Sequence, residues 1–243
     1  MSPYLSGIMA AIHITPESAA LFLDFDGTLV DIAPRPEAVM VPSDLPLLLT
    51  SLASRLGGAL CIVSGRPLAQ LEAYLPASLS MAGEHGAALR LADATPTRRR
   101  HLPTPPAAWL CRAEALASSF PGALLERKAH GFVLHYRLAP EATTVARDLL
   151  ERLVSTCDDF VVMPARMAWE VKPSAVSKGG VVVELMAEPP FAGRRPIFIG
   201  DDVTDEAGFD AARAAGGMGL RMQDAFGNPA ALRDWMWRLV SAP

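Results

Sequence analysis

The sequence lacks long apolar runs, a cysteine pattern and an excess of positive charge. No stretch approaches the roughly 18 consecutive apolar residues of a membrane helix, so we expect no membrane partner. The cysteines Cys61, Cys111 and Cys157 are far apart and lack metal-ligand spacing, which indicates neither a disulfide framework nor a zinc site. A formal net charge of -4 gives no electrostatic reason to expect nucleic acid as a partner.

Basic residues are scarce at the N-terminus as well. The segment Met1–Thr15 has no Lys or Arg, and His13 breaks its apolar patch, so no secretory signal is predicted. Together with the cysteine usage, this favours a cytoplasmic protein. The one basic cluster, Arg98-Arg99-Arg100, is predicted to be a solvated loop.

What is present is typical of a globular chain with a sizeable core. The 243 residues are 51% apolar and 20% charged. We favour a monomer as the oligomeric state. Apolar runs without helical spacing, such as Leu21–Leu23, Ala59–Val63 and Arg195–Ile199, predict buried parallel strands. Helical segments alternate with them, among them Leu45–Leu56 and Lys178–Met186.

The middle of the chain has a different order, in which helices alternate with hairpins. This order predicts a small unit with a mainly antiparallel sheet, inserted in the rest. The fold class is therefore predicted as α/β, a Rossmann-like parallel-sheet core with an inserted small α+β cap domain. The predicted boundaries are 1–89 and 167–243 for the core and 90–166 for the cap.

Several predicted core strands end in polar residues. Asp24 and Asp26 follow the first strand, and Ser64 and His85 follow the next two. A later strand runs into a third acidic group, which consists of Asp201, Asp202 and Asp205. Turn chemistry explains each case singly, but the carboxyl ends of parallel strands meet at one sheet edge, so their coincidence predicts a site.

Converging carboxylates at this edge need a counter-charge. Two unit charges 4 Å apart repel by ~4 kcal/mol at an effective dielectric of 20. Oxygen ligands favour Mg2+, which typically binds a few carboxylates, waters and a substrate phosphate. One of the paired aspartates can then attack phosphorus, while Asp26 transfers protons. Thr28, Ser64 and loop amides can hold phosphoryl oxygens, and Lys178 is the predicted neutralising lysine.

These residues resemble the haloacid dehalogenase-like superfamily of aspartate-nucleophile phosphatases. Four of its motifs occur in order, carried by Asp24-Phe25-Asp26-Gly27-Thr28, Ser64, Lys178 and Gly200-Asp201-Asp202 with Asp205. More narrowly, the chain is similar to bacterial trehalose-6-phosphate phosphatases from Leu21 to about Trp237. This likeness rests on further motifs, which are Ser64-Gly65-Arg66, Gly83-Glu84-His85-Gly86, Glu126 with Lys128, His135-Tyr136-Arg137, Glu170-Val171-Lys172-Pro173, Ser177-Lys178-Gly179 and Gly200 to Glu206.

The resemblance implies an enzyme that hydrolyses trehalose 6-phosphate, the last step of trehalose biosynthesis. It implies Asp24 as nucleophile, Asp26 as general acid and base, and Mg2+ on Asp24, the Asp26 carbonyl and Asp201. Whether Asp202 or Asp205 lies nearer the metal stays open. Phosphate contacts are expected from Thr28, Ser64 and Gly65, and sugar contacts from Arg66, His85, Glu126, Lys128, Glu170 and Lys172.

Other readings remain open at this stage. On spacing alone, the acids and bases of the cap could form a salt-bridged solvent face. The enzyme could act on sucrose phosphate or a hexose phosphate, or be a phosphomutase. A sugar-phosphate sensor and a phosphoacceptor signalling domain are the non-enzyme alternatives, and the inserted segment argues against the second.

Overall fold

The computed structural model describes residues 15, 18–33, 35–92, 97–99, 101–165 and 167–241. The chain divides into two compact units. The larger unit comprises Met1–Arg99 and Ser177–Pro243, and the smaller unit comprises Arg100–Val176. The smaller unit is therefore one continuous insertion in the chain of the larger one.

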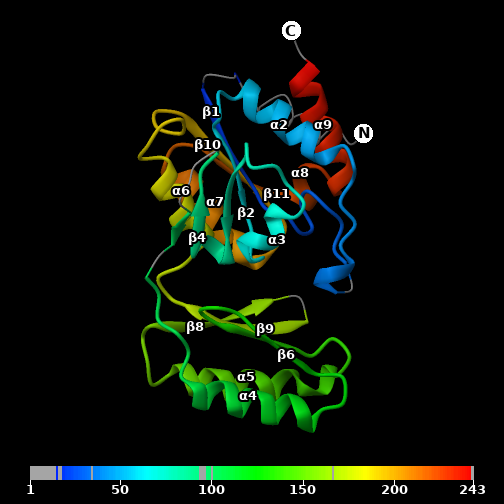
Figure 1. Ribbon diagram of the computed structural model, residues 1–243, viewed down its shortest axis with the longest axis vertical. Helices are drawn as coiled ribbons and strands as arrows, with labels where there is room; N and C mark the ends of the chain where they lie inside the picture. Colours follow the sequence, from blue (N-terminus) through cyan, green and yellow to red (C-terminus); the bar gives the residue numbers. More distant parts are fainter. Residues whose placement is uncertain are drawn as a thin grey trace. The chain divides into compact units, whose positions relative to one another are not determined.

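A seven-stranded sheet forms the centre of the larger unit (Figure 1). Its strands lie in the order β11-β10-β1-β2-β3-β4-β5. Neighbours from β11 to β3 are parallel, whereas β4 and β5 add an antiparallel edge. The strand bounds are β1 Ala19–Leu23, β2 Leu60–Val63, β3 Ser80–Gly83, β4 Ala88–Arg90, β5 Arg98–Arg99, β10 Arg195–Gly200 and β11 Met218–Arg221.

Helices cover both faces of this sheet. The central strand β1 is apolar throughout because its alternate residues pack into the cores on the two faces. Leu21 and Leu23 belong to one core cluster, which α2, α3, α8 and α9 complete. Ala20 and Phe22 belong to a second cluster, completed by α6 and α7. The helix bounds are α2 Leu45–Arg55, α3 Leu68–Glu72, α6 Lys178–Leu185, α7 Glu206–Ala214, α8 Met222–Ala225 and α9 Pro229–Ser241, with short 3-10 helices η1 Pro36–Ala38, η2 Glu84–Gly86 and η4 Val203–Asp205.

The strand order reverses its direction at β1. From β1 the chain continues through β2 and β3 on one side, and β10 lies on the other side. In open α/β sheets, ligands bind beyond the carboxyl ends of the strands at such a point. Asp24 follows β1 and Asp201 follows β10, so the fold brings these two carboxylates to neighbouring strand ends.

The smaller unit is built on a four-stranded antiparallel sheet in the order β6-β7-β9-β8. The helices α4 and α5 pack against one face of it through Trp109, Ala146 and Leu150, which contact Phe132 and Phe160 in the same core cluster (Figure 1). The alternate strand positions belong to the opposite face. The bounds are α4 Ala107–Ser119, β6 Leu124–Arg127, β7 Phe132–His135, η3 Pro140–Ala142, α5 Thr143–Val154, β8 Phe160–Ala165 and β9 Ala168–Pro173.

The predicted fold class is confirmed, but the predicted boundaries at residues 90 and 166 are not those of the two units. The antiparallel edge strand β5 extends the larger unit to Arg99. At the second boundary, β9 pairs with β7 and β8, so residues up to Val176 belong to the smaller unit. Strand pairing, β4 with β5 and β9 with β7 and β8, decides both boundaries.

The basic cluster is another correction. Arg98 and Arg99 form β5 instead of a loop, and Arg98 Nη2 lies 2.9 Å from Glu188 Oε2. A two-residue strand is too short to show an alternating pattern in the sequence. Arg100 lies outside the described residues. So do residues 1–14, on which the prediction of no secretory signal rests.

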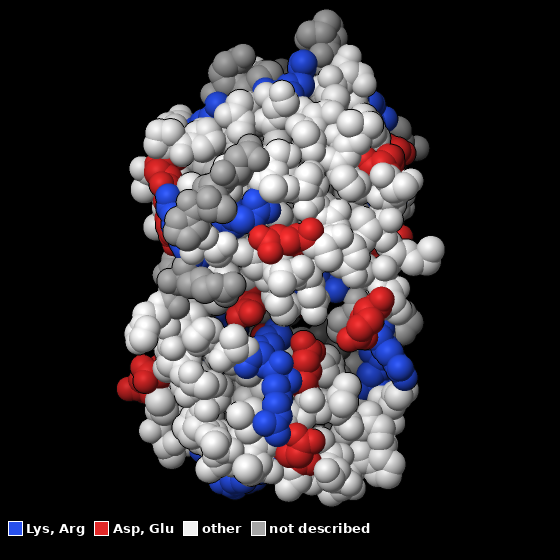
Figure 2. All heavy atoms as spheres, in the orientation of Figure 1, with Lys and Arg blue, Asp and Glu red and all other residues white. Residues whose placement is uncertain are grey.

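The surface carries charges of both signs. In the view of Figure 2, Lys and Arg atoms lie next to Asp and Glu atoms among mostly uncharged residues. Exposed ion pairs of this kind include Arg147 with Glu151 and Arg127 with Glu114, and such pairs contribute little to stability. Within the part of the chain that the structure describes, every helix is too short or too polar to cross a membrane.

Two adjacent glycines of α6 test the packing of α6 on α7. A Cβ atom at Gly179 would lie 2.3 Å from the Ala207 carbonyl oxygen, whereas one at Gly180 would meet only Ser177 Oγ at 3.6 Å. We expect Gly179→Ala to lower the free energy of unfolding by about 1–3 kcal/mol, since backbone must move. Gly180→Ala should raise it by up to about 1 kcal/mol, because alanine favours a helix. Urea denaturation of both variants checks this, and equal effects would contradict it.

Candidate active site

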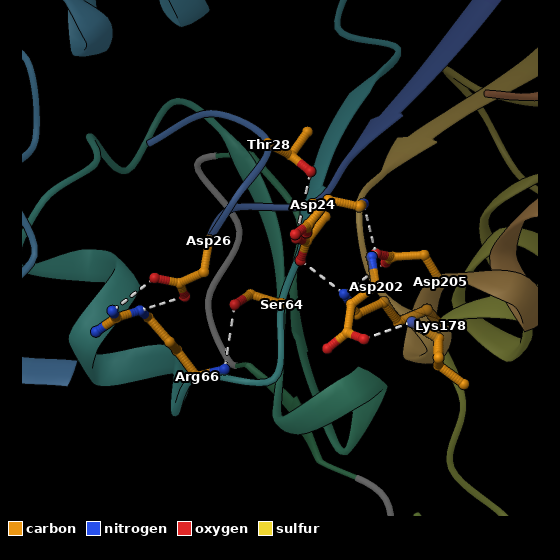
Figure 3. Close-up of polar contacts among 10 residues, drawn as sticks. Asp24, Asp26, Thr28, Ser64, Arg66, Lys178, Asp202 and Asp205 are labelled. Carbon is orange, nitrogen blue, oxygen red and sulfur yellow. Dashed lines mark hydrogen bonds and ion pairs between the residues drawn. The ribbon is translucent and has the colours of Figure 1, made fainter. Parts of the chain in front are cut away.

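The site begins where β1 ends. The Asp24 backbone N–H donates to the Ile199 carbonyl of β10 at 2.9 Å, so the residue is fixed between two strands. Its side chain is almost wholly buried. Phe25 is completely buried in the core, and Asp26 follows at the edge of the site. Figure 3 shows the two carboxylates turned to different partners, Asp24 toward Lys178 and Asp26 toward Arg66.

Lys178 joins two of the acids. It is the first residue of α6, which Ser177 caps by accepting a hydrogen bond from the Gly180 N–H. Its Nζ lies 2.6 Å from Asp24 Oδ1 and 2.6 Å from Asp205 Oδ1, and the lysine is 3% exposed. The ammonium group therefore bridges the first and last acidic motifs inside the protein.

Asp205 fixes the loop that follows β10. Its Oδ2 accepts hydrogen bonds from the backbone N–H groups of Asp201 and Asp202, both at 2.9 Å. Asp202 caps η4 in return by accepting from the Val203 N–H. A Cβ atom at Gly200 would lie 2.3 Å from the Asp205 carboxyl carbon, so only glycine leaves room for this arrangement.

Asp201 completes a cluster that can hold a metal ion. Carboxylate oxygens of Asp24, Asp201 and Asp205 all lie within 4.8 Å of one another. Among the described residues, Asp201 Oδ1 has no hydrogen-bond partner although the atom is buried. A buried oxygen without a partner calls for an explanation, and a hard divalent cation with oxygen ligands fits this donor set.

The electrostatics of the cluster agree with this assignment. Burial raises the pKa of Asp24, the nearby Asp205 and Asp201 raise it further, and Lys178 opposes them. Burial together with Asp205 and Asp202 raises the pKa of Asp201 to about 6. Burial lowers the pKa of Lys178, but the two carboxylates outweigh it and raise the value overall. The protein thus supplies less positive charge than its acids need.

Asp26 has a separate counter-ion. Arg66 Nε lies 2.6 Å from Asp26 Oδ2, and Arg66 Nη2 lies 2.7 Å from Oδ1. The guanidinium group also lies above the Phe25 ring, 5.7 Å from its centre, and Nη1 donates to Gln70. This bidentate pair fixes the orientation of the Asp26 carboxylate.

Of the other predicted phosphate-binding residues, Thr28 contacts Asp24, whereas Ser64 and Gly65 follow β2. Ser64 follows β2, is 1% exposed and accepts a hydrogen bond from the Arg66 N–H at 3.1 Å. The buried Thr28 donates to Asp24 Oδ2 at 3.5 Å. A Cβ atom at Gly65 would lie 2.8 Å from His85 Cε1, so this glycine lets the imidazole approach the backbone.

His85 stands in a strained turn. Its φ of 57° and the φ of 50° at Glu84 are both in the left-handed region, which residues other than glycine adopt at a cost. The N–H groups of these two residues donate to the carbonyls of Ser64 and Arg66. The turn therefore places the His85 imidazole against the loop that carries Ser64.

The remaining predicted residues belong to the smaller unit. Lys128 Nζ lies 2.7 Å from Glu170 Oε1, and Glu126 Oε2 lies 2.8 Å from His135 Nε2. The bond from His135 lowers the pKa of Glu126, and burial lowers the pKa of Lys172. Lys172 donates to the Val176 carbonyl. The register pairs Glu126 with Val133 and Val133 with Glu170, so the acids occupy one row of the sheet.

Known proteins of one family match this chain over most of its length. A family model for trehalose-phosphatase matches residues 22–227. The chain belongs to the trehalose-phosphatase family. It is 40% identical over 219 residues to a probable trehalose-phosphate phosphatase of Sinorhizobium fredii, covering 88% of this chain and 81% of that one.

A further relative and one solved structure are also similar to this chain. The trehalose-6-phosphate phosphatase of Escherichia coli is 36% identical over 234 residues, covering 94% of this chain and 85% of that one. The solved C-terminal domain of C. albicans trehalose-6-phosphate phosphatase has the same fold, with a TM-score of 0.79 at 21% identity and coverage of 98% and 96%. The family resemblance predicted from the motifs is confirmed.

Sequence reasoning left two features of this trehalose-phosphatase family member unassigned. Asp205 is the buried partner of Lys178 and lies in the acidic cluster, whereas Asp202 caps a helix outside it. The spacing of Asp202 and Asp205 is that of a capping box, which was a usable signal. The second feature is Gly27, whose φ of 80° places its Cα against the Asp201 carboxylate.

Gly27 and Gly227 form a matched pair for testing this contact. A Cβ atom at Gly27 would lie 2.2 Å from Asp201 Oδ2, but nothing lies within 4 Å of one at Gly227, whose φ is 85°. Alanine costs about 1–2 kcal/mol at either position through its backbone conformation. We expect only Gly27→Ala to lower phosphatase activity, by about 10-fold or more, because the Asp201 carboxylate must move. Phosphate-release assays check this, and equal activities of the two variants would contradict it.

Proposed function

We propose that this chain hydrolyses trehalose 6-phosphate to trehalose and phosphate, in an Mg2+-dependent reaction with an aspartyl-phosphate intermediate. Family membership and the substrate named for the E. coli relative support the substrate. The observation that carries the chemistry is the buried contact of Lys178 with Asp24 and Asp205. It places an oriented carboxylate beside a candidate cation site, as phosphoryl transfer requires.

Asp24 is the proposed nucleophile. Lys178 holds its Oδ1, so Oδ2 is the oxygen turned toward the hydroxyl of Thr28. This oxygen forms a bond to phosphorus while the bond from phosphorus to the sugar oxygen breaks. Water then attacks the phosphorus, and Asp24 leaves as a carboxylate again.

Asp26 is the proposed general acid and base. It gives a proton to the leaving sugar oxygen and later takes one from the attacking water. Each of its oxygens accepts one hydrogen bond from Arg66, which orients the carboxylate and leaves a lone pair on each oxygen for a proton. Arg66 also brings a positive charge close to the position expected for the phosphate.

Phosphoryl oxygens would be held by the residues around Asp24. The Ser64 hydroxyl accepts from the Arg66 N–H and keeps its own proton for an acceptor. Thr28 and the Gly65 N–H are further proposed donors. Asp24, Asp201 and the Asp26 carbonyl would hold Mg2+, which when bound neutralises carboxylates and stabilises charge on the phosphoryl group.

The smaller unit is proposed to select the sugar. Glu126, Lys128, Glu170 and Lys172 combine donors and acceptors, and sugar hydroxyls need both. Lys128 and Glu170 are buried as a pair, with side chains 12% and 6% exposed. Burying such a pair costs desolvation energy, so the pair is weak evidence for a gain in stability. A binding role explains its presence better. His85 and Arg66 are the proposed sugar contacts from the larger unit.

Phosphate release from a panel of sugar phosphates tests the proposal. We expect turnover of trehalose 6-phosphate with Mg2+, loss of it with chelator, and recovery when Mg2+ is restored. Asp24→Asn, which keeps the size of the side chain, should lower kcat by about 10^3-fold or more and controls for contaminating phosphatases.

Three outcomes would contradict the proposal. Equal kcat/KM for glucose 6-phosphate and trehalose 6-phosphate would refute selection of the disaccharide. Isomerisation that needs a bisphosphate activator, without phosphate release, would indicate a mutase. Tight binding of sugar phosphates without any turnover would indicate a sensor.

A further inference from the structure

Arg221 lies beside the acidic cluster, although it belongs to none of the motifs. It is the last residue of β11 and pairs in register with Gly200 of β10. Asp201 follows Gly200 directly, so Arg221 stands at the same sheet edge as the cluster, one strand farther out. Its side chain is 39% exposed.

Three groups hold the Arg221 guanidinium. Its Nη2 pairs with Glu206 Oε1, and its Nη1 donates to the Asp201 carbonyl at 3.4 Å. Its central carbon lies 5.9 Å from the centre of the Phe209 ring, which is buried. An isolated surface ion pair would do little, but these contacts join β11 to the start of α7 and to the loop after β10.

The contacts converge on the peptide group between Asp201 and Asp202. The carbonyl of this peptide accepts from Arg221, and its N–H donates to Asp205 Oδ2 at 2.9 Å. A planar peptide bonded on both edges has a fixed orientation. That orientation in turn sets the direction of the Asp201 side chain, whose Oδ1 is buried beside Asp24 and Asp205.

We propose that Arg221 is a positioning residue for the cation site and acts through the Asp201–Asp202 peptide. The inference rests on the proposed Mg2+ site. Groups that orient metal ligands without touching the metal typically change metal affinity by about 10–100-fold when they are removed. Arg221 is one strand away from the acids, so it would control how tightly the cation is held and not how the phosphate is attacked.

Arg213 provides a matched control. Its guanidinium lies 5.7 Å from the centre of the same Phe209 ring, pairs with Asp210 and donates to the Gly219 carbonyl. Arg213→Ala therefore removes a cation from the same aromatic ring while leaving the Asp201 peptide bonded. Glu206→Gln is a second variant, because it weakens the ion pair that holds Arg221 without removing the arginine.

Titration calorimetry without substrate tests this inference, with Mn2+ in place of Mg2+. We expect Arg221→Ala to raise the Kd by about 10-fold, Glu206→Gln by less, and Arg213→Ala to match the unmodified protein. Kinetics should agree, with Arg221→Ala needing more Mg2+ for half-maximal rate and reaching a near-normal kcat at saturation.

Equal Kd values for Arg221→Ala and Arg213→Ala would overturn the inference, and so would a loss of kcat that saturating Mg2+ does not restore. If the unmodified protein binds no divalent cation, the proposed metal site falls together with the inference. Hydrolysis of other sugar phosphates with normal Mn2+ binding would refute only the proposed substrate.

Discussion

The buried ammonium group of Lys178 is the contact on which the site depends. Three carboxylates converge at the ends of β1 and β10, and Lys178 is within 2.6 Å of two of them. Removing one partner of a buried, charged network leaves the others unpaired at a cost of several kcal/mol. Glycines at positions 27 and 200 let the acids approach the backbone, so the loops are shaped around the charges.

Much of the core could be predicted because its signals are local. The apolar strands that end in acids predicted the parallel sheet, and they predicted that the acids at the ends of β1 and β10 lie close together. The edges could not be predicted in this way. β5 has two residues, and the pairing of β9 with β8 depends on contacts across a turn, so the two compact units divide about ten residues later than the sequence predicts.

The sequence also did not predict which side chains contact one another. Arg66 is predicted to contact sugar, and the structure adds a contact that the sequence did not predict: its Nε and Nη2 donate to Asp26, forty residues away in sequence. Asp205 was left open beside Asp202, and only the fold shows that it faces Lys178. The roles of Glu126, Lys128, Glu170 and Lys172 stay predictions, since their contacts lie within the smaller unit.

The central claim is that Asp24 attacks phosphorus and forms a covalent intermediate. The stereochemical course at phosphorus tests it most directly, with a trehalose 6-phosphorothioate whose phosphorus is made chiral by sulfur and two oxygen isotopes. Hydrolysis in water that carries the third oxygen isotope releases a chiral thiophosphate, whose configuration can be read. Two successive in-line displacements, first by Asp24 and then by water, predict net retention of configuration. Net inversion would show that water attacks the substrate directly and would contradict the account.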